Sequence, residues 1–288
     1  MSMLAYLDPI HIHSFIQAAL KEDVGPGDYT TLATVNQDAQ GKAQLLVKDE
    51  GVLAGVEMAL HIFEEVDPTL QVQTFMTDGA SIQHGQIVLE VQGNAQSILK
   101  AERLVLNCMQ RMSGIATYTK RMVNLLEGTR SQLLDTRKTT PNFRIAEKWA
   151  CKIGGAVNHR FALYDMILIK DNHVDYAGGI KAALEKALNY NQSHQLGLAI
   201  EIEVRNESEL DEVLEIGGVQ RIMLDNFSPD RLRDAIRKIN GRFITEASGG
   251  ITESTLRAYG ETGVDYISMG ALTHQIKSLD LSLKAKKA

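Results

Sequence analysis

Residues 133–174 read LLDTRKTTPNFRIAEKWACKIGGAVNHRFALYDMILIKDNHV, and the order of elements in this stretch decides the fold. Two short apolar runs, residues 132–134 and 166–169, predict buried strands, and polar residues follow each run at once. Apolar residues recur at helical spacing between the two runs, which predicts a helix over residues 142–153. A strand, a helix and a second strand in this order are typical of a parallel sheet, so we expect the two strands to be neighbours in one.

Cationic side chains flank the two predicted strands. Arg137 and Lys138 follow the first strand, Lys170 follows the second, and His159 and Arg160 lie just before the second. Active sites of parallel sheets lie at the carboxyl ends of the strands, so we expect these five groups to converge there. Such a cluster repels itself unless an anion sits in it, which predicts a ligand with several negative charges. The alternative is a set of separate solvated side chains, the usual state of lysine and arginine.

The composition is that of an ordinary globular protein with one large or two medium domains. Of the 288 residues, 44% are hydrophobic and 23% are charged, and the net charge of −6 argues against a general nucleic-acid binder. The two cysteines, Cys108 and Cys151, are too few for a disulfide framework and fit a reducing compartment. The N-terminus lacks the pattern of a signal peptide, and no segment is apolar enough to span a bilayer, so we expect a cytoplasmic protein.

The first part of the chain predicts an α+β scaffold domain. Alternating apolar and polar residues with glycines at the bends predict curved strands around one amphipathic helix, residues 57–65. The expected strands are residues 43–47, 51–55, 70–75 and 87–91.

A long helical pattern follows over residues 94–128. We expect one helix or two abutting helices, with a break or kink at Ser113–Gly114. Arg103 belongs to a polar stripe on this helix. Either the stripe is simply exposed, or Arg103 reaches an anion site, in this subunit or in another one.

Strand and helix signals then alternate to near the C-terminus. The expected strands are residues 132–134, 166–169, 198–204, 221–224, 243–246 and 266–268. The expected helices after residues 142–153 are residues 179–190, 207–216, 229–239, 253–259 and a final one near the C-terminus. Six units at near-regular spacing predict an incomplete α/β barrel, because the segment is too short for eight. We expect an N-terminal domain over residues 1–115, a barrel domain over residues 116–275, and a C-terminal segment, 276–288, that can return to the first domain.

The ends of the later strands carry carboxylates and small residues. Glu201 and Glu203 share one face of the third strand, with Glu203 nearer its carboxyl end, and Asp225 ends the fourth. A salt bridge to barrel lysines is the other interpretation of Glu201, because an unpaired buried charge is costly. Small residues in the turns Ser248–Gly250 and Met269–Ala271 let backbone N–H groups approach a phosphate. A sugar bearing phosphate and pyrophosphate, bound with Mg²⁺, fits these groups.

The chain resembles the quinolinate phosphoribosyltransferase family nearly from end to end. The motifs are EDVGPGDYTT, AERLVLNCMQRMSGIAT, DTRKTTPNFR, EKWACKIGGAVNHRFALYDMILIKDNH, IEIEV, LDN, EASGGI and ISMGAL. DTRKTTP followed by NHR and LIKDNH at this spacing is highly specific. Asn142–Phe143 stands where the family commonly has Gly-Leu, and Ala156 where a third glycine is common, but the charged positions are intact.

The resemblance implies an enzyme, a pentosyltransferase of de novo NAD biosynthesis. The implied reaction forms nicotinate mononucleotide, CO₂ and pyrophosphate from quinolinate and 5-phosphoribosyl-1-pyrophosphate. Mg²⁺ is the implied cofactor, with no organic cofactor. The implied fold is an N-terminal α/β domain beside an incomplete α/β barrel of about six strands, in a homodimer whose sites the partner chain completes.

The resemblance also implies roles for individual residues. The groups around the quinolinate carboxylates would be Arg137, His159, Arg160 and Lys170, with Arg103 supplied across the dimer interface. Further substrate contacts would come from Thr136 and from Lys138, which would face the pyrophosphate or the acceptor. Glu203 and Asp225 would hold the ribose hydroxyls and Mg²⁺. The 5′-phosphate would be bound by Ser248, Gly249, Gly250, Met269, Gly270 and Ala271. The catalytic candidates are Lys138, Lys170, Glu203 and Asp225.

Three alternatives stay open from the sequence. The first is a related phosphoribosyltransferase with another acidic acceptor, such as nicotinate, which would release no CO₂. The second is a Schiff-base lyase that uses Lys170, since a desolvated lysine among other cations can be nucleophilic. The third is a phosphometabolite-binding protein without catalysis, which the presence of both Glu203 and Asp225 argues against.

Overall fold

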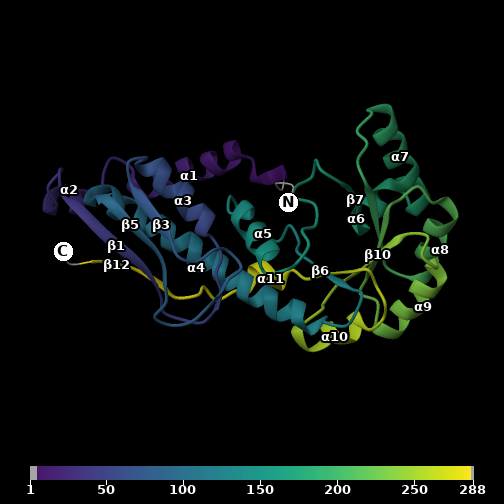
Figure 1. Ribbon diagram of the computed structural model, residues 1–288. Helices are drawn as coiled ribbons and strands as arrows, with labels where there is room; N and C mark the ends of the chain where they lie inside the picture. The colour runs from purple at the N-terminus through teal and green to yellow at the C-terminus, as the bar shows by residue number, and fades with distance from the viewer. Residues whose placement is uncertain (1–4, 287–288) are drawn as a thin grey trace. The chain divides into compact units, whose positions relative to one another are not determined.

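The computed structural model describes residues 5–286 (Figure 1), which form two compact units. The first unit takes the chain up to Lys120, then Lys138–Gly155, then the chain from Leu272 onward. The second unit takes Arg121–Arg137 and Ala156–Ala271.

The predicted domain boundaries after residues 115 and 275 stay a prediction. Residues 1–4 and 287–288 lie outside the described residues. They include the start of the N-terminus, for which we expect no signal peptide, and the end of the predicted C-terminal segment.

The first unit is built on a four-stranded antiparallel sheet in the order β12-β1-β5-β3, which confirms the α+β class expected for the N-terminal domain. Its strands, with the separate pair β2 and β4, are β1 (Gln40–Val47), β2 (Gly51–Val52), β3 (Gln71–Thr74), β4 (Ser81–Ile82), β5 (Ile87–Asn94) and β12 (Leu281–Ala285). Its helices are η1 (Ala5–Leu7), α1 (Pro9–Val24), α2 (Tyr29–Thr34), α3 (Val56–Val66), α4 (Ala95–Leu125), α5 (Arg144–Ile153) and α11 (Ala271–His274). Both α4 and α11 contain residues of the two units.

The last described element is a strand, whereas the sequence predicted a helix near the C-terminus. The helix there is limited to the short α11, and β12 pairs antiparallel with β1, with Leu283 opposite Leu45 and Leu281 opposite Val47. Leu281 and Leu283 are buried. Their spacing of two residues puts both on the same face of a strand, which a helix would not do.

Helix α4 has 31 residues and continues through Ser113 and Gly114, so the predicted break there is wrong. A Cβ atom added at Gly114 would lie 2.3 Å from the carbonyl oxygen of Lys277, and the Ser113 hydroxyl bonds to the backbone of Ala54. The small pair therefore allows two segments to pack closely against the helix. Among residues 5–286, no helix combines the length and apolarity needed to cross a membrane.

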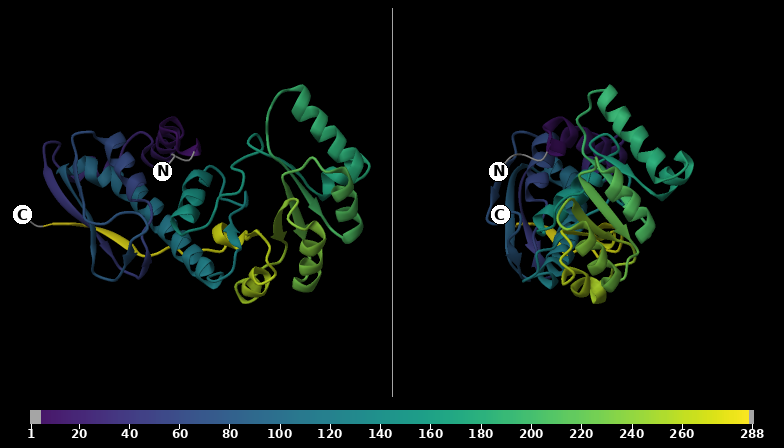
Figure 2. Two further views of the ribbon diagram at one scale, coloured as in Figure 1. Left: turned by 45° about the vertical axis from the view of Figure 1, so that its right-hand side comes forward. Right: turned by 90° about the vertical axis from the view of Figure 1, so that its right-hand side faces the viewer.

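The second unit is built on a six-stranded parallel sheet. Its strands are β6 (Gln132–Leu134), β7 (Ile167–Ile169), β8 (Ile200–Val204), β9 (Arg221–Asp225), β10 (Ile244–Ser248) and β11 (Tyr266–Ser268). Its helices are α6 (Asp171–Ala177), α7 (Ile180–Ser193), α8 (Glu207–Ile216), α9 (Pro229–Ile239) and α10 (Glu253–Gly260). Figure 2 shows helices of this unit lying along the outer side of the sheet.

The strand order β6-β11-β10-β9-β8-β7 is that of a barrel left open between β6 and β7. An incomplete α/β barrel was predicted and is confirmed. The predicted pairing of the first two strands is wrong, because β6 and β7 are the two edges of the sheet. The helix between them in the chain, α5, belongs to the first unit.

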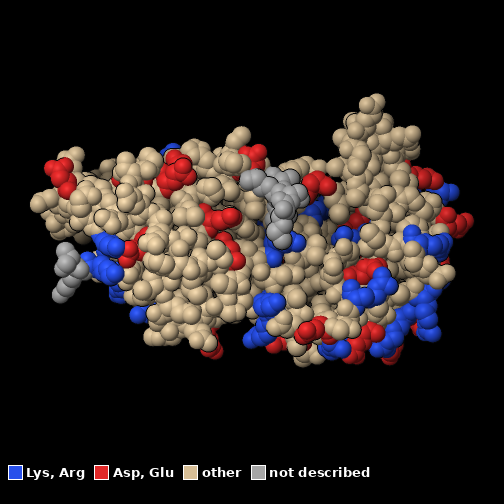
Figure 3. All heavy atoms as spheres, viewed as in Figure 1, with Lys and Arg blue, Asp and Glu red and all other residues tan. Residues whose placement is uncertain are grey.

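Charges on the outer helices are mostly paired with each other. Arg237 pairs with Asp234 on α9, and Arg257 lies 2.7 Å from Glu261 at the end of α10. Figure 3 shows basic and acidic side chains interspersed over α9 and α10. Exposed pairs of this kind add little stability and offer no concentrated charge to a ligand. The chemically distinctive charges therefore have to be sought at the ends of the strands.

Candidate active site

Lys170, Glu203 and Asp225 stand at the carboxyl ends of three successive strands, β7, β8 and β9. Lys170 Nζ donates to Glu203 Oε2 at 3.1 Å. Burial raises the pKa of both Glu203 and Asp225, and the negative charge of Asp171 raises both further. The positive charge of Lys170 acts in the opposite direction. The carboxylates thus carry more negative charge than Lys170 alone offsets. Oxygen donors with surplus negative charge fit Mg²⁺ or the hydroxyls of a sugar.

The segment before β7 is held along the edge of β6. Val157 forms a parallel bridge with Leu134. Beyond this bridge, the Asp135 carboxylate accepts hydrogen bonds from Asn158 Nδ2 at 2.6 Å and from the His159 N–H at 2.8 Å. A buried carboxylate that accepts two bonds from one turn fixes the backbone of that turn. The NHR motif is therefore anchored directly beside the residues that follow β6.

Arg137 and Arg160 approach each other in this region. Both are half-buried, and burial together with the charge of Arg137 lowers the pKa of Arg160. Arg160 Nη1 donates to the carbonyl of Met166 at 3.1 Å, which fixes the guanidinium. Two arginines held close together repel each other unless an anion lies between them, and their planar forks fit carboxylates. The charge of Arg137 therefore acts on Arg160, and the convergence of all five predicted cationic groups stays a prediction.

A second layer of charges, buried except for the partly exposed Arg221, lies one pleat further from the carboxyl ends. Glu201 and Arg221 are register partners on β8 and β9. His159 Nε2 lies 3.1 Å from Glu201 and 3.5 Å from Glu246, and Arg221 Nη1 lies 2.9 Å from Glu246 and 3.7 Å from Glu201. Both carboxylate side chains are 0% exposed. The ion-pair interpretation of Glu201 is confirmed, although its cation is an arginine and not a lysine.

Burial and the charge of Glu246 raise the pKa of Glu201. Burial also opposes ionisation of Glu246, but His159 and Arg221 lower its pKa. His159, Glu201 and Glu246 have the donor types of a metal site, yet Arg221 already occupies the position of the cation between the two carboxylates. We therefore regard this layer as an ion-pair cluster beneath the site.

The N–H of Arg160 donates to His159 Nδ1 at 2.7 Å, and Nε2 faces the carboxylates of Glu201 and Glu246. His159 is buried, and both its ring nitrogens face protein groups. The predicted contact of His159 with substrate stays a prediction. The hydrogen bond at Nδ1 links His159 to the backbone of Arg160.

The glycine turn after β10 is required by close packing. Gly249 and Gly250 have φ angles of 94° and 61°, and a Cβ atom at Gly249 would lie 2.2 Å from Asn226 Oδ1. Ser248 is the register partner of Asp225, so this turn begins beside the carboxylate of β9. A side chain at Gly249 would displace Asn226, whose amide donates to Asp225.

The turn after β11 is tied to β6. The Met269 N–H donates to the carbonyl of Leu134 at 3.0 Å, so this N–H is already used in the sheet. Gly270 and Ala271 follow at the start of α11. The turn lies beside the end of β6, and its predicted role in phosphate binding stays a prediction.

Two predicted site residues belong to the first unit. Arg103 is exposed on α4, and Lys138 is exposed at the start of the segment Lys138–Gly155. Thr136 is half-buried in the second unit, just after β6. The roles of all three stay predictions.

Sequence analysis missed Glu246, Arg221 and Asp171. Glu246 and Arg221 lay at the ends of their predicted strands, where charge is unremarkable. The available signal was that Glu201, placed in a buried strand, needs a partner of opposite charge, and Arg221 begins the next strand. Asp171 stands beside Lys170, but its effect on two carboxylates from other strands depends on tertiary structure.

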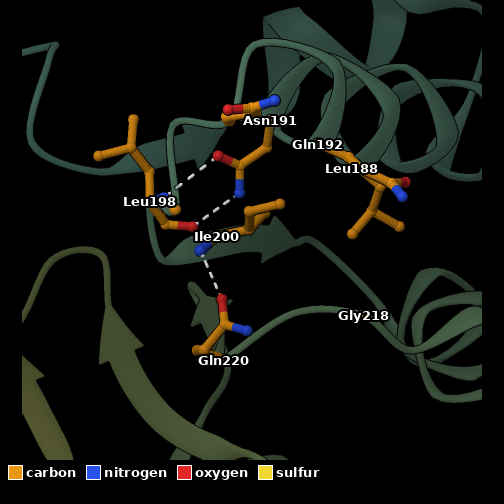
Figure 4. A pocket seen from close by; sticks show the side chains of 9 residues that line it. Leu188, Asn191, Gln192, Leu198, Ile200, Gly218 and Gln220 are labelled. Carbon is orange, nitrogen blue, oxygen red and sulfur yellow. Dashed lines mark hydrogen bonds between the residues drawn. The ribbon is translucent and has the colours of Figure 1, made fainter.

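A hollow of about 460 Å³ lies at the opposite, amino ends of β8 and β9 (Figure 4). It is lined by Leu188, Asn191, Gln192, Gln195, Gly197, Leu198, Ile200, Gly218 and Gln220. Asn191 bonds to both backbone groups of Leu198, and Gln220 Oε1 accepts from the Ile200 N–H at 2.7 Å. No lining side chain is charged, so this hollow does not suit an anionic substrate.

Comparisons with known proteins match almost the whole chain to one family. The family model described as quinolinate phosphoribosyl transferase, N-terminal domain, matches residues 28–113, and the model of the C-terminal domain matches residues 115–284.

Individual relatives agree with these models. The chain is 46% identical to a protein of Nicotiana tabacum named quinolinate phosphoribosyltransferase [decarboxylating] 2a, mitochondrial, over 93% of this chain and 80% of that one. It is 41% identical to a probable nicotinate-nucleotide pyrophosphorylase [carboxylating] of Bacillus subtilis (strain 168), over 91% of this chain and 89% of that one. The crystal structure of NadC from Streptococcus pyogenes is similar, with 39% identity, a TM-score of 0.89, and coverage of 96% of this chain and 97% of that one.

Proposed function

The chain belongs to the quinolinate phosphoribosyltransferase family, and from this premise we propose how its site carries out the family's reaction. The enzyme is a nicotinate-nucleotide pyrophosphorylase (carboxylating), a phosphoribosyltransferase of NAD biosynthesis. It transfers phosphoribosyl from 5-phosphoribosyl-1-pyrophosphate to quinolinate and releases pyrophosphate and CO₂. The observation that carries the proposal is the gathering of close arginines and a Lys170–carboxylate group at one end of a parallel sheet.

Arg137 and Arg160 bind the two quinolinate carboxylates. Their mutual proximity is costly without an anion, and a dicarboxylate offers two charges to two planar forks. Lys170 adds a third cation, and Arg103 would come from the partner subunit of a homodimer. His159 contributes by fixing the Arg160 backbone through Nδ1, in addition to any direct contact with substrate.

Glu203 and Asp225 hold the ribose hydroxyls and Mg²⁺. The fit rests on their donor type and on the burial and neighbouring negative charge that raise the pKa values of both carboxylates. Mg²⁺, when bound, would neutralise charge on the pyrophosphate. As pyrophosphate leaves, positive charge develops at the anomeric carbon, and the two carboxylates stabilise that charge. Lys138 would receive the departing pyrophosphate, and Thr136 would contact substrate beside Arg137.

The 5′-phosphate lies against the turns Ser248–Gly250 and Met269–Ala271. Because Met269 uses its N–H in the sheet, the following residues Gly270 and Ala271 have the larger role in the second turn. After the ring nitrogen attacks the ribose, the adjacent carboxylate leaves as CO₂, the positive ring nitrogen stabilises the electron pair left on the ring carbon, and that carbon takes a proton from water to give nicotinate mononucleotide. No organic cofactor is needed for that step.

A Schiff-base lyase is the weaker second candidate. Lys170 lies 3.1 Å from Glu203 and its side chain is 46% exposed. A lysine nucleophile needs a desolvated free amine, and an ion pair in contact with water stabilises the ammonium instead. The two buried free thiols, Cys108 and Cys151, agree with a reducing compartment, and we keep the cytoplasm as the proposed location.

The test is a product assay on purified protein with quinolinate, 5-phosphoribosyl-1-pyrophosphate and Mg²⁺, with nicotinate as a parallel acceptor. We expect equal amounts of CO₂ and pyrophosphate with quinolinate and neither with nicotinate. Pyrophosphate formed from nicotinate without CO₂ would assign a different acceptor. A borohydride-trapped adduct on Lys170 would favour the lyase.

A further inference from the structure

Glu147 is a buried carboxylate that the proposed mechanism does not use. It lies on α5 in the first unit, and its side chain is 0% exposed. Arg111 of α4 donates to Glu147 Oε1 from Nη2 at 2.9 Å and from Nε at 3.2 Å. Thr140 donates to the same carboxylate from its hydroxyl and its backbone N–H, both at 3.0 Å. Four hydrogen bonds to one buried carboxylate make a rigid junction.

Arg111 extends this junction to the segment after β11. Its Nη1 donates to the carbonyl of Ile276 at 3.1 Å, and its Nη2 also donates to the carbonyl of Thr273. The Thr273 hydroxyl in turn donates to the carbonyl of Lys138 at 2.8 Å. One ion pair thus connects α4, α5, the Lys138–Thr140 segment and the chain from Thr273 to Ile276.

The short segment Lys138–Thr140 is therefore fixed at both ends. At one end the Lys138 carbonyl accepts from Thr273, and at the other the Thr140 N–H donates to Glu147. The Lys138 residue itself is exposed. A lysine has a long flexible side chain, so the position of its backbone decides which region its ammonium can sample.

We propose that Arg111 and Glu147 are positioning residues that hold the backbone of Lys138 so that its ammonium meets the pyrophosphate of 5-phosphoribosyl-1-pyrophosphate. The proposal rests on the proposed function, which gives Lys138 that role. Neither residue touches substrate. Loss of the junction leaves Lys138 in the chain but lets its backbone move, so binding of the pyrophosphate group weakens more than binding of quinolinate.

The decisive variant is Glu147→Gln. A glutamine has nearly the same shape but offers one acceptor oxygen and one NH₂ group, so it cannot accept from both Arg111 and the Thr140 N–H. We expect KM for 5-phosphoribosyl-1-pyrophosphate to rise at least fivefold, with KM for quinolinate within twofold. The inhibition constant of inorganic pyrophosphate should rise by a similar factor. Amide hydrogen exchange over residues 138–140 should become faster.

Two further variants make the test specific. Thr273→Val removes only the bond to the Lys138 carbonyl from this set and should reproduce a smaller change of the same kind even if Glu147→Gln folds poorly. Arg121→Lys is the matched control, because Arg121 also lies on α4 and pairs with a glutamate, Glu253, but both side chains are exposed. It should leave kinetics and exchange unchanged.

Unchanged amide hydrogen exchange at residues 138–140 in both Glu147→Gln and Thr273→Val would overturn the proposal. Equal rises in KM for both substrates together with a lower melting temperature would also overturn it, because they indicate a merely structural role. If the wild-type protein forms no product, the proposed function fails, but hydrogen exchange still decides whether the junction fixes this segment.

Discussion

The two ends of the six-stranded sheet share the same strands but differ in the chemistry around them. At the carboxyl ends, Lys170 pairs with Glu203, and burial and like charges raise the pKa values of Glu203 and Asp225. At the amino ends, the amides of Asn191 and Gln220 bond to the backbone and no charged side chain lines the hollow. A hollow alone is therefore a poor guide to function. Charge held at a cost to folding distinguishes the carboxyl ends of these strands from their amino ends.

A third region, the buried cluster of Glu201, Glu246, His159 and Arg221, lies within the sheet between its two ends. Its opposite charges face each other at distances of 2.9–3.7 Å, so we expect it to contribute to the fold and to the orientation of the NHR motif. Substitutions in these three regions should therefore change different properties, stability or catalysis, and by different amounts.

Arg221→Met should have the largest effect, on stability. Removal of the guanidinium leaves two buried carboxylates with only His159, and breaking a buried ion pair costs about 3–5 kcal/mol. The free energy of unfolding in urea measures the loss. Arg237→Met is the control, because it breaks an exposed pair with Asp234 and should cost less than about 1 kcal/mol. Equal losses of unfolding free energy in the two variants would mean that the buried cluster stabilises the fold no more than an exposed ion pair does.

Glu203→Gln should have the largest effect on catalysis. We expect kcat to fall about 100-fold, or about 2.7 kcal/mol, because stabilisation of the developing ribose charge is lost. Burial raises the pKa of Glu203, so the ionised form is costly in the folded state and the variant should be at least as stable as wild type. Pyrophosphate release and thermal unfolding check the two parts. A fall in both activity and stability would contradict this separation.

Arg137→Lys should raise KM for quinolinate at least tenfold, or about 1.4 kcal/mol, because a lysine cannot bind a carboxylate through two parallel hydrogen bonds. Steady-state kinetics with each substrate varied in turn provide the measurement. Unchanged quinolinate kinetics would remove Arg137 from the acceptor site.

Asp171→Asn should shift the acid limb of kcat/KM to lower pH, with less than a tenfold effect at pH 7. Glu203 and Asp225 act as carboxylates, so activity is lost as pH falls through their pKa values, and Asp171 helps to raise both. Removing that charge favours ionisation. Asp175→Asn is the matched control on the same helix, since Asp175 faces Arg205 on the surface and should leave the limb in place. A shift to higher pH would contradict the stated sign.

Asn191→Ala should leave the kinetics of both substrates within twofold while stability falls by about 1 kcal/mol. The substitution removes the bonds to the N–H and carbonyl of Leu198 at the amino-end hollow. Kinetics and urea unfolding are measured together. A large kinetic loss would show that the amino end of the sheet matters for function and would end the contrast between the two ends.

Much of the barrel was predictable because its elements are short and strongly patterned. The predicted helices over residues 207–216 and 229–239 coincide with α8 and α9, and the strands at residues 132–134 and 266–268 coincide with β6 and β11. Local periodicity carries this information. A single helix through Gly114 was one of two expectations, but local pattern could not decide between them, because the glycine serves a contact with Lys277, far away in the sequence.

The sequence by itself determined the family, the alternation of strands and helices, and the residue types at the strand ends, since motif spacing and local periodicity are properties of the chain. Only the tertiary structure decided that β6 and β7 are opposite edges, that Glu201 meets Arg221 and Glu246, and that Glu147 fixes the Lys138 segment. Ion pairs and strand order join residues far apart in sequence. Their partners are selected by packing and by the cost of burying an unpaired charge, neither of which local pattern records.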